Sequence, residues 1–392
     1  MSKCEECGNT YKEGEVICVV CDEVVVDEVR PKLVAVSAIT AQLKAKNLKS
    51  ELSSEIGNLW PVNNDICYSF ITQVERRFKN KNKFHSYYEE QDEEDSVPSL
   101  FKKLISSELA FKSLVKLLMD ELVEAAEEAG AHKVAGANIV FMHYKSSAKV
   151  KDTGRLLVVM VDNKSGFKFD DKLIPEEEKH VNISALKQAA LFDLALFDEI
   201  YPDPPNRDTY LKFIQGSSTG AFFKNAFGCE IKADNGRSVD ELYRALFDYH
   251  SKNELSNDFY EDARSKITEA FKNAAKSITK KQVSLRELAV IVESSLPKGS
   301  ELSGTFLNFV NRNYSVNEII EPTKQSAGAA DWVDIKARDE SFKAKIYRSQ
   351  IGADGSGKTV EYNIDTHRLS LDVEDAVTRD ALERLVAGQT DE

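Results

Sequence analysis

Four of the six cysteines lie within the first 21 residues, at a spacing that suits a metal site. They form two Cys-x-x-Cys pairs, separated by ten residues: Cys4 with Cys7, and Cys18 with Cys21. Four thiolates from two such turns can occupy the corners of a tetrahedron, as a structural zinc site requires. Two disulfides would need an oxidising compartment, and a redox pair would need only one of the turns. The spacing predicts a zinc ribbon over residues 1–30, with Zn²⁺ as its cofactor and a rubredoxin-like iron site as the alternative.

The charge of this N-terminal module bears on what it can contact. Residues 1–30 contain three cations and eight carboxylates, a net charge of −5 before the thiolates are counted. Such a surface repels phosphate. We therefore expect the module to stabilise the protein or to contact another protein, rather than to bind nucleic acid.

A phosphate-binding pattern occurs near the C-terminus, where residues 352–359 read Gly-Ala-Asp-Gly-Ser-Gly-Lys-Thr. In P-loop nucleotide hydrolases this pattern follows a parallel strand and opens a helix. Here residues 360–364 alternate as a strand, and only 33 residues follow Thr359, too few for further β-α units. We interpret the segment as a hairpin turn, and a P-loop hydrolase stays as an alternative.

A basic patch lies at the end of a predicted helix: Arg76, Arg77, Lys79, Lys81 and Lys83. Lysine and arginine side chains neutralise phosphates and release counterions, so these five residues are the candidate nucleic-acid-binding site. Cations are also favoured at the negative end of a solvated helix, and that interpretation stays open. A second cluster, at residues 276–281, is expected to be a solvated turn.

Six carboxylates follow the basic patch directly, within residues 89–95. At distances beyond a Debye length of about 8–10 Å, their charge would cancel the field of the five cations. Two arrangements stay open. The acidic segment either points away from the patch, or it competes for the same cations as an internal phosphate mimic.

Catalytic constellations are not evident in the sequence. The six histidines show no metal-ligand spacing, and scattered Ser, His and Asp residues do not define a triad. We expect His143 and His180 to be structural residues held by hydrogen bonds. The sequence therefore predicts a protein without enzymatic activity.

The most strand-like part of the chain is residues 138–228, which we expect to form the core. Residues 138–144 and 155–161 are short apolar runs rich in β-branched residues, and the polar stretch between them suits a hairpin. A helical pattern through Leu191, Leu194 and Phe197 follows, and aromatic and glycine residues then dominate up to Gly228.

Other segments complete an α+β fold in which helices and strands are segregated more than alternated. Residues 32–40 alternate as a strand, residues 63–65 start a helix with an Asx cap, and residues 96–130 form a helical region. In the following region, serines start the helices at Ser238 and Ser256 and a capping box occupies residues 284–287. Strands and a final helix are expected at residues 332–338, 342–351, 359–364, 368–373 and 374–387.

These elements predict four divisions of the chain. They are a zinc-ribbon-like module at residues 1–30, a mixed core with antiparallel strands at 31–235, a helical region at 236–315, and a C-terminal region rich in β-hairpins at 316–392.

The overall composition is that of an ordinary globular protein. Of 392 residues, 42% are hydrophobic and 30% are charged, and no apolar run reaches the length of a membrane span. We expect a cytoplasmic protein in which Cys67 and Cys229 are buried free thiols. The net charge of −13 argues against a protein that coats DNA with its whole surface. Any nucleic-acid surface must therefore be local.

Three blocks in the central region resemble bacterial nucleoid-associated proteins of the NdpA/YejK type. They are a strand ending in His143-Tyr144, the segment 180–183 (His-Val-Asn-Ile) ahead of a helix, and the segment 210–216 (Tyr-Leu-Lys-Phe-Ile-Gln-Gly). The similarity runs from about residue 33 to about residue 384, with the predicted zinc module outside it. The resemblance implies association with the nucleoid and binding of DNA.

Three functional hypotheses follow. The first is a nucleoid-associated protein that binds double-stranded DNA with low sequence specificity and has no catalytic activity. The second is an adaptor that contacts nucleoid-bound proteins or phage-defence machinery through the acidic module. The third is the P-loop hydrolase. A homodimer is the assembly under consideration, and no membrane partner is expected.

Overall fold

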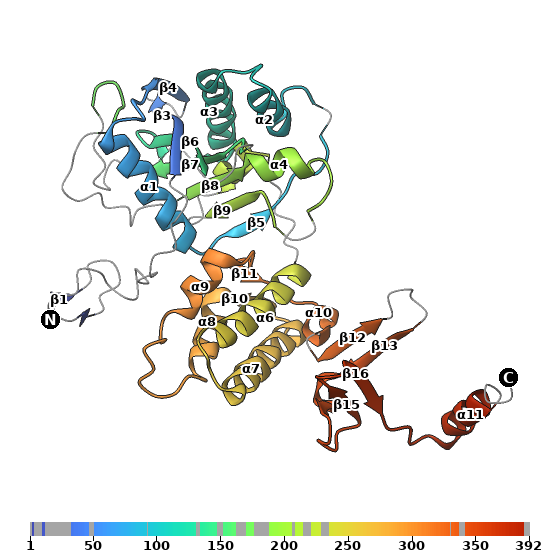
Figure 1. The fold of residues 1–392 in the computed structure, drawn as a ribbon. Helices are drawn as coiled ribbons and strands as arrows, with labels where there is room; N and C mark the ends of the chain where they lie inside the picture. The colour runs from blue at the N-terminus through green and yellow to red at the C-terminus, as the bar shows by residue number, and fades with distance from the viewer. Residues whose placement is uncertain are drawn as a thin grey trace.

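The computed structural model describes residues 2–3, 10–11, 33–46, 51–91, 93–130, 134–146, 152–161, 170–175, 188–205, 208–214, 221–228, 235–329, 331–336 and 342–387. The protein is a mixed α+β chain with antiparallel sheets, as predicted. A core of sheet and helices comes first, a helical unit follows, and a C-terminal unit of short strands and one helix ends the chain (Figure 1).

A seven-stranded sheet forms the centre of the core, in the order β4-β3-β6-β7-β8-β9-β5, and every neighbouring pair is antiparallel. Its strands are β3 (Leu33–Ala45), β4 (Leu52–Leu59), β5 (Phe84–Ser86), β6 (Asn138–Ser146), β7 (Arg155–Val161), β8 (Gln188–Asp193) and β9 (Leu211–Ile214). The central pair β6–β7 is the hairpin expected from its two apolar runs, with Asn138 opposite Val161. That prediction is confirmed.

Helices cover both faces of this sheet. One face is covered by α1 (Asp65–Asn80), and the other by α2 (Val97–Ile105), α3 (Phe111–Glu128), α4 (Leu194–Ile200) and α5 (Ala221–Ala226). Alternate residues of β6 therefore meet different helices, with Val140 and Met142 on the α1 side and Ile139 and Phe141 on the α3 side. Burial on both faces explains why β6 and β7 read as continuous apolar runs.

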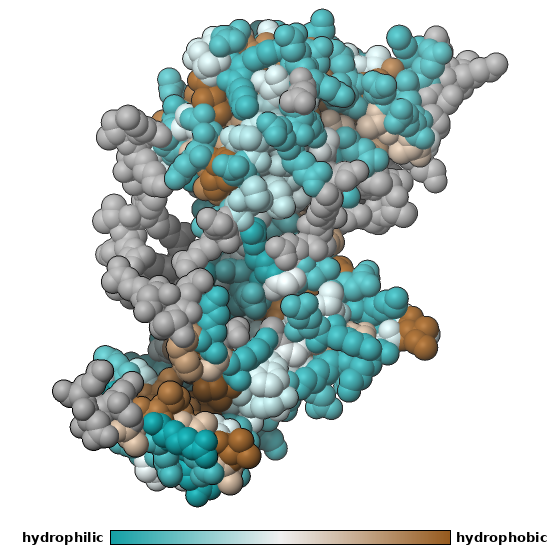
Figure 2. Space-filling view, turned by 90° about the vertical axis from the view of Figure 1, so that its right-hand side faces the viewer, coloured by the Kyte–Doolittle hydropathy of each residue, from teal (hydrophilic) through white to brown (hydrophobic). Residues whose placement is uncertain are grey.

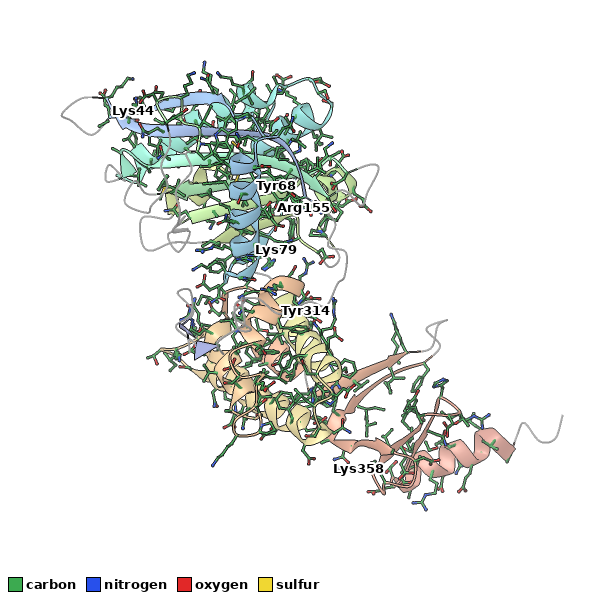
Figure 3. All side chains as sticks on the ribbon, turned by 60° about the vertical axis from the view of Figure 1, so that its left-hand side comes forward. Lys44, Tyr68, Lys79, Arg155, Tyr314 and Lys358 are labelled. Atoms are coloured by element: carbon green, nitrogen blue, oxygen red, sulfur yellow. The ribbon has the colours of Figure 1, made fainter. Side chains whose placement is uncertain are left out.

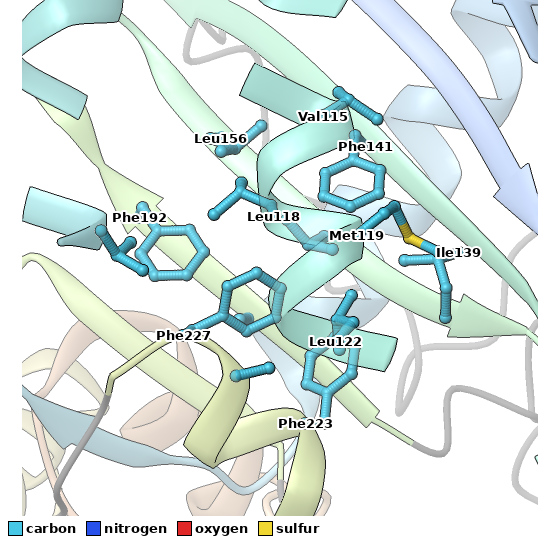
Figure 4. Packing of buried hydrophobic residues seen from close by; sticks show 14 of the residues in the cluster. Val115, Leu118, Met119, Leu122, Ile139, Phe141, Leu156, Phe192, Phe223 and Phe227 are labelled. Atoms are coloured by element: carbon cyan, nitrogen blue, oxygen red, sulfur yellow. The ribbon is translucent and has the colours of Figure 1, made fainter. Parts of the chain in front are cut away.

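The larger apolar cluster lies between α3 and the sheet. Figure 4 shows Met119 of α3 beside Ile139 and Phe141 of β6, with Leu118 and Leu122 of the same helix in the same cluster. All five side chains are completely buried. Full burial of one such side chain stabilises a fold by about 1.5–3 kcal/mol. This layer therefore fixes α3 on the sheet.

One helical prediction in the core needs correction. The pattern through Leu191, Leu194 and Phe197 is not one helix, because residues 188–193 form β8 and only residues 194–200 are helical. β8 lies between β7 and β9, so burial on both faces removes the alternation that would have identified a strand. The helical region predicted at residues 96–130 is present and contains two helices, α2 and α3.

The start of α1 agrees with its prediction. The side chain of Asn64 accepts a hydrogen bond from the Ile66 N–H at 2.8 Å, which satisfies one of the helix's N-terminal donors. Cys67, one turn further on, is a buried free thiol as expected. Cys229 lies outside the described residues.

The helical unit contains α6 (Asn235–Lys252), α7 (Asn257–Lys276), α8 (Leu285–Glu293), α9 (Phe306–Asn313) and α10 (Lys324–Ala329). Ser256 caps α7, and Ser284 with Glu287 forms the predicted capping box of α8. Two short strands, β10 (Val283–Ser284) and β11 (Ile319–Ile320), pair antiparallel. The apolar core of the unit includes Ile320 and Ala327, so the structure extends it past the boundary expected at residue 315.

The C-terminal unit contains β12 (Trp332–Lys336), β13 (Lys343–Tyr347), a 3₁₀ turn (Arg348–Gln350), β14 (Ile351–Ala353), β15 (Val360–Asn363), β16 (Arg368–Leu371) and α11 (Ala376–Ala387). The pairs β12–β13 and β15–β16 are antiparallel hairpins. β14 and β15 pair in parallel, with Ile351 opposite Val360. The interpretation of residues 352–359 as an antiparallel hairpin turn is therefore wrong.

Near the N-terminus, β1 (Ser2–Lys3) and β2 (Thr10–Tyr11) pair antiparallel on either side of residues 4–9. The cysteines of the predicted zinc ribbon lie outside the described residues, so the zinc ribbon stays a prediction. Within the part of the chain that the structure describes, no cluster of three or more His, Cys, Asp or Glu side chains could hold a metal ion. No helix in that part is long and apolar enough to cross a membrane.

Candidate nucleic-acid interface

The C-terminal half of α1 and its C-cap residue carry four of the five predicted cations. Its apolar residues, including Phe78, pack against the sheet. Arg76 and Lys79 are exposed, Arg77 is partly buried, and Lys81 is exposed at the C-cap. Figure 3 shows Lys79 on the part of α1 nearest the helical unit. We call Arg76, Arg77, Lys79 and Lys81 the α1 patch.

Within the α1 patch, Lys79 has a carboxylate partner on its own helix. Its ammonium lies 2.5 Å from Glu75 Oε1, one turn earlier, and the lysine side chain is 57% exposed. The Glu75 side chain is only 15% exposed, so this ion pair is partly buried. The pair still leaves the Lys79 side chain more than half exposed, and a phosphate can approach its ammonium there.

Lys83 does not belong to the patch, which corrects its prediction. The residue is 2% exposed, and its ammonium donates hydrogen bonds to the carbonyl oxygens of Lys79 at 3.0 Å and Asn311 at 2.9 Å. Burial, together with the positive charges of Lys212 and Lys79, lowers the pKa of Lys83 to about 7. Lys83 joins the core to the helical unit and is not available to DNA.

Further polar contacts hold the end of α1 against α9. The Asn311 amide donates to Asn82 Oδ1 at 2.8 Å, and Arg312 Nε donates to Asn80 Oδ1 at 2.6 Å. The His85 N–H donates to Asn317 Oδ1 at 2.8 Å. These contacts fix the C-terminal turn of α1, so the α1 patch is held in one place relative to both units.

Two cations that the sequence analysis missed lie on the same face of the sheet as α1. Lys212 of β9 lies opposite His85 of β5. Arg155 of β7 is 3.1 Å from the Asp193 carboxylate, and Figure 3 shows it beside α1. Burial lowers the pKa of Lys212, while the Asp193 carboxylate opposes that shift. The sequence signal that could have identified Lys212 is a single cation within an otherwise apolar strand, Leu-Lys-Phe-Ile at residues 211–214.

The described residues of the acidic segment after β5 lie on the opposite side of the sheet from the α1 patch. Tyr88 already packs in the cluster on the α3 side. The Gln91 N–H then donates to the Tyr201 hydroxyl at 3.0 Å, and Lys103 of α2 donates to the Glu94 carbonyl at 2.9 Å. Of the two arrangements left open by the sequence, the described part of the segment adopts the one directed away from the patch.

The second basic cluster lies beside the first turn of α8 and contributes a hydrogen bond to it. Lys276, Lys280 and Lys281 are exposed, and the Lys280 ammonium donates to Glu287 Oε1 at 2.7 Å. This hydrogen bond and those from Ser284 lower the pKa of Glu287 to about 2. The expectation of a solvated turn is confirmed.

The glycine-rich loop at residues 352–359 already holds an anion of its own. The N–H groups of Gly355 and Gly357 donate to the Glu361 carboxylate at 3.0 and 2.7 Å. Lys358 donates to the Ser349 carbonyl at 2.9 Å. Consecutive N–H groups of this kind form an anion-binding nest. Because Glu361 fills the nest and a strand follows the loop, these residues do not form a nucleotide-binding P-loop.

His143 has a structural role at the turn of the central hairpin. Its Nε2 lies 2.9 Å from the Thr153 carbonyl oxygen, its ring stacks on Phe111, and burial lowers its pKa. At Gly154, where φ is +96°, a Cβ atom would approach His143 Nε2 to 2.6 Å. The expectation for His143 is confirmed, and His180 lies outside the described residues.

Comparisons with known proteins agree with the resemblance seen in the sequence. The family model described as "Nucleoid-associated protein YejK" matches residues 45–381. A nucleoid-associated protein of Pseudomonas savastanoi pv. phaseolicola (strain 1448A / Race 6) is 24% identical over 238 residues, which are 57% of this chain and 65% of that relative. The similarity thus spans less than two thirds of the relative's length. Because the family match covers most of the chain, this protein belongs to the family of nucleoid-associated proteins typified by YejK.

Proposed function

We propose that this protein binds double-stranded DNA in the bacterial nucleoid through the phosphate backbone, without catalysing a reaction. Membership of a nucleoid-associated family supports the nucleoid location and the DNA partner. The observation that carries the proposal is the α1 patch, in which exposed cations lie on the face of the sheet opposite the acidic segment.

The charge distribution supports local binding with low sequence specificity. A protein with a net charge of −13 repels DNA over most of its surface, so the duplex approaches where cations are concentrated. Cations at the end of a helix contact phosphates, and phosphate contacts carry no direct sequence information. Four such contacts make the logarithm of the binding constant fall with the logarithm of salt concentration at a slope of about −3.6.

A triple variant tests this proposal. Replacing Arg76, Lys79 and Lys81 with Gln removes three exposed cations from the α1 patch. Since each phosphate contact contributes about tenfold in affinity near 0.1 M salt, we expect a loss of roughly 100- to 1,000-fold. Fluorescence anisotropy with two unrelated duplexes should give the same loss for both.

A matched control separates the α1 patch from net charge. Lys276, Lys281 and Lys298 are exposed residues of the helical unit. Replacing these three with Gln changes the net charge equally but leaves the α1 patch intact, so affinity should stay near that of the wild type. Equal losses in the two triple variants, or a loss in neither, would contradict the proposal.

We also propose that Cys4, Cys7, Cys18 and Cys21 hold one zinc ion, on the strength of their spacing alone. Metal analysis of protein prepared under reducing, chelator-free conditions should find about one equivalent. The Cys7→Ser variant should lose the ion, because three thiolates bind zinc much less tightly than four. The Cys67→Ala control, altered in the core, should keep it. Less than about a tenth of an equivalent in the wild type would exclude the site.

A further inference from the structure

The last helix, α11, is exposed along its whole length. Val377 is 77% exposed, Leu382 46%, Leu385 65% and Val386 61%. A separate helix of about 12 residues is only marginally stable in water. Contiguous exposed apolar surface usually marks an interaction site. Among the described residues of one chain, none covers this apolar side of the helix, so α11 needs a further partner surface.

The side chains of α11 divide cleanly around the helix axis. At about 100° per residue, the apolar side chains occupy one half of the circumference and the charged side chains the other half. The apolar half carries Val377, Ala381, Leu382, Leu385 and Val386, and the charged half carries Arg379, Asp380, Glu383 and Arg384.

The sequence of α11 reads almost the same in both directions. AVTRDALERLVA becomes AVLRELADRTVA when reversed. Each position keeps its chemical class on reversal, except that Thr378 exchanges with Leu385. The centre of this reversal lies between Ala381 and Leu382. A two-fold axis at that point makes the helix surface complementary to itself, which a symmetric dimer requires.

The charges favour an antiparallel arrangement. Arg379 and Glu383 border the apolar half on one edge, and Asp380 and Arg384 border it on the other. In an antiparallel pair, each edge meets the same edge of the partner in reverse order. Arg379 then lies opposite Glu383 of the partner subunit, and Arg384 lies opposite Asp380 of the partner subunit.

The rest of the C-terminal unit is compatible with contact between two copies. Residues 342–387 contain seven cations and eight carboxylates, a net charge of −1, whereas the whole chain carries −13. Two copies can therefore meet here with little repulsion. Leu369 and Leu371 of β16 are 40% and 56% exposed. Figure 2 faces this unit and shows apolar surface gathered at the lower end of the molecule.

We propose that two copies of this chain associate through their C-terminal units, with their α11 helices packed antiparallel about that two-fold axis. The dimer brings two α1 patches into one particle. The association depends on α11 and not on DNA, so it stands or falls separately from the proposed DNA binding.

Light scattering coupled to size-exclusion chromatography tests the dimer in the full chain. Across a dilution series, the wild type should reach the mass of two chains at high concentration. The Leu382→Glu/Leu385→Glu variant should keep the mass of one chain, with an unchanged far-ultraviolet circular dichroism spectrum for the remaining fold. The Thr279→Glu/Gln282→Glu control adds the same charge at exposed positions of the helical unit, and it should dimerise like the wild type. A wild type that stays single, or a Leu382→Glu/Leu385→Glu variant that still dimerises, overturns the proposal.

A charge exchange tests the antiparallel geometry. Arg379→Glu places a carboxylate opposite Glu383 of the partner subunit, so the dimer dissociation constant should rise roughly five- to tenfold. Adding Glu383→Arg restores the opposite charges and should restore the dissociation constant. If the double variant is no tighter than Arg379→Glu alone, the helices do not pair in this way.

Discussion

The core and the C-terminal unit both contain antiparallel strands, yet the core buries its apolar side chains and the C-terminal unit leaves many of them exposed. In β6 of the core, residues 139–142 are completely buried between α1 and α3. In the C-terminal unit, all four residues of β16 and all twelve of α11 are exposed. The core buries its apolar side chains within a single chain. The C-terminal unit leaves apolar side chains exposed, where a second copy of the chain can cover them. The α1 patch lies on the core.

Matched alanine substitutions in the two regions should differ most in their effect on stability. Phe141→Ala opens a cavity in the fully packed core and should cost about 3–5 kcal/mol of unfolding free energy. Leu371→Ala, at a position that is 56% exposed, should cost no more than about 0.5 kcal/mol. Urea denaturation followed by fluorescence measures both. Similar costs at the two positions would remove the distinction between the regions.

Two glycines with positive φ sharpen the same comparison. Gly154 in the core has φ +96°, and a Cβ atom there would lie 2.6 Å from His143 Nε2, whereas Gly355 in the C-terminal unit has φ +77° and open space around it. Gly154→Ala should therefore cost about 2–4 kcal/mol, from strain and collision together. Gly355→Ala should cost about 1 kcal/mol, from strain alone. Thermal unfolding of both variants checks the difference, and equal shifts would argue against close packing at Gly154.

Local sequence signals identified the elements whose determinants are local. The Asn64 cap of α1, the Ser256 cap of α7 and the capping box at residues 284–287 each depend on a few neighbouring residues, and all three are present in the structure. The hairpin β6–β7 was also predicted, because its two apolar runs lie close together in the sequence.

The errors arose where distant residues decide the structure. In the sequence, nothing distinguishes Lys83 from its basic neighbours. In the structure, its ammonium donates a hydrogen bond to the carbonyl oxygen of Asn311, which is 228 positions away. β8 lacks a strand-like alternation because neighbouring strands and helices bury five of its six residues. For Lys83 and β8, no short window of sequence contains the partners that decide the structure. The loop after β14 differs, because Glu361 lies only four residues after Gly357, and the error there was the pairing direction, which is parallel.

The buried Lys83 predicts a pH dependence that an exposed lysine lacks. Burial lowers its pKa from 10.5 to about 7, so between these values the unfolded chain holds a proton that the folded chain has released. The unfolding free energy should therefore rise with pH in this window, by up to about 1.4 kcal/mol per pH unit. Lys83→Met should remove the rise, and Lys358→Met, at an exposed position of the C-terminal unit, should preserve it. Urea denaturation at pH 7 and above tests this, and an unchanged slope in Lys83→Met would contradict it.

The salt dependence of DNA binding tests the central claim most directly. For the wild type, the logarithm of the binding constant should fall with the logarithm of salt concentration at a slope of about −3.6. In the Arg76→Gln/Lys79→Gln/Lys81→Gln variant, the loss of three phosphate contacts should reduce the slope to about −0.9. A variant whose slope and affinity match those of the wild type would show that DNA does not bind at the end of α1.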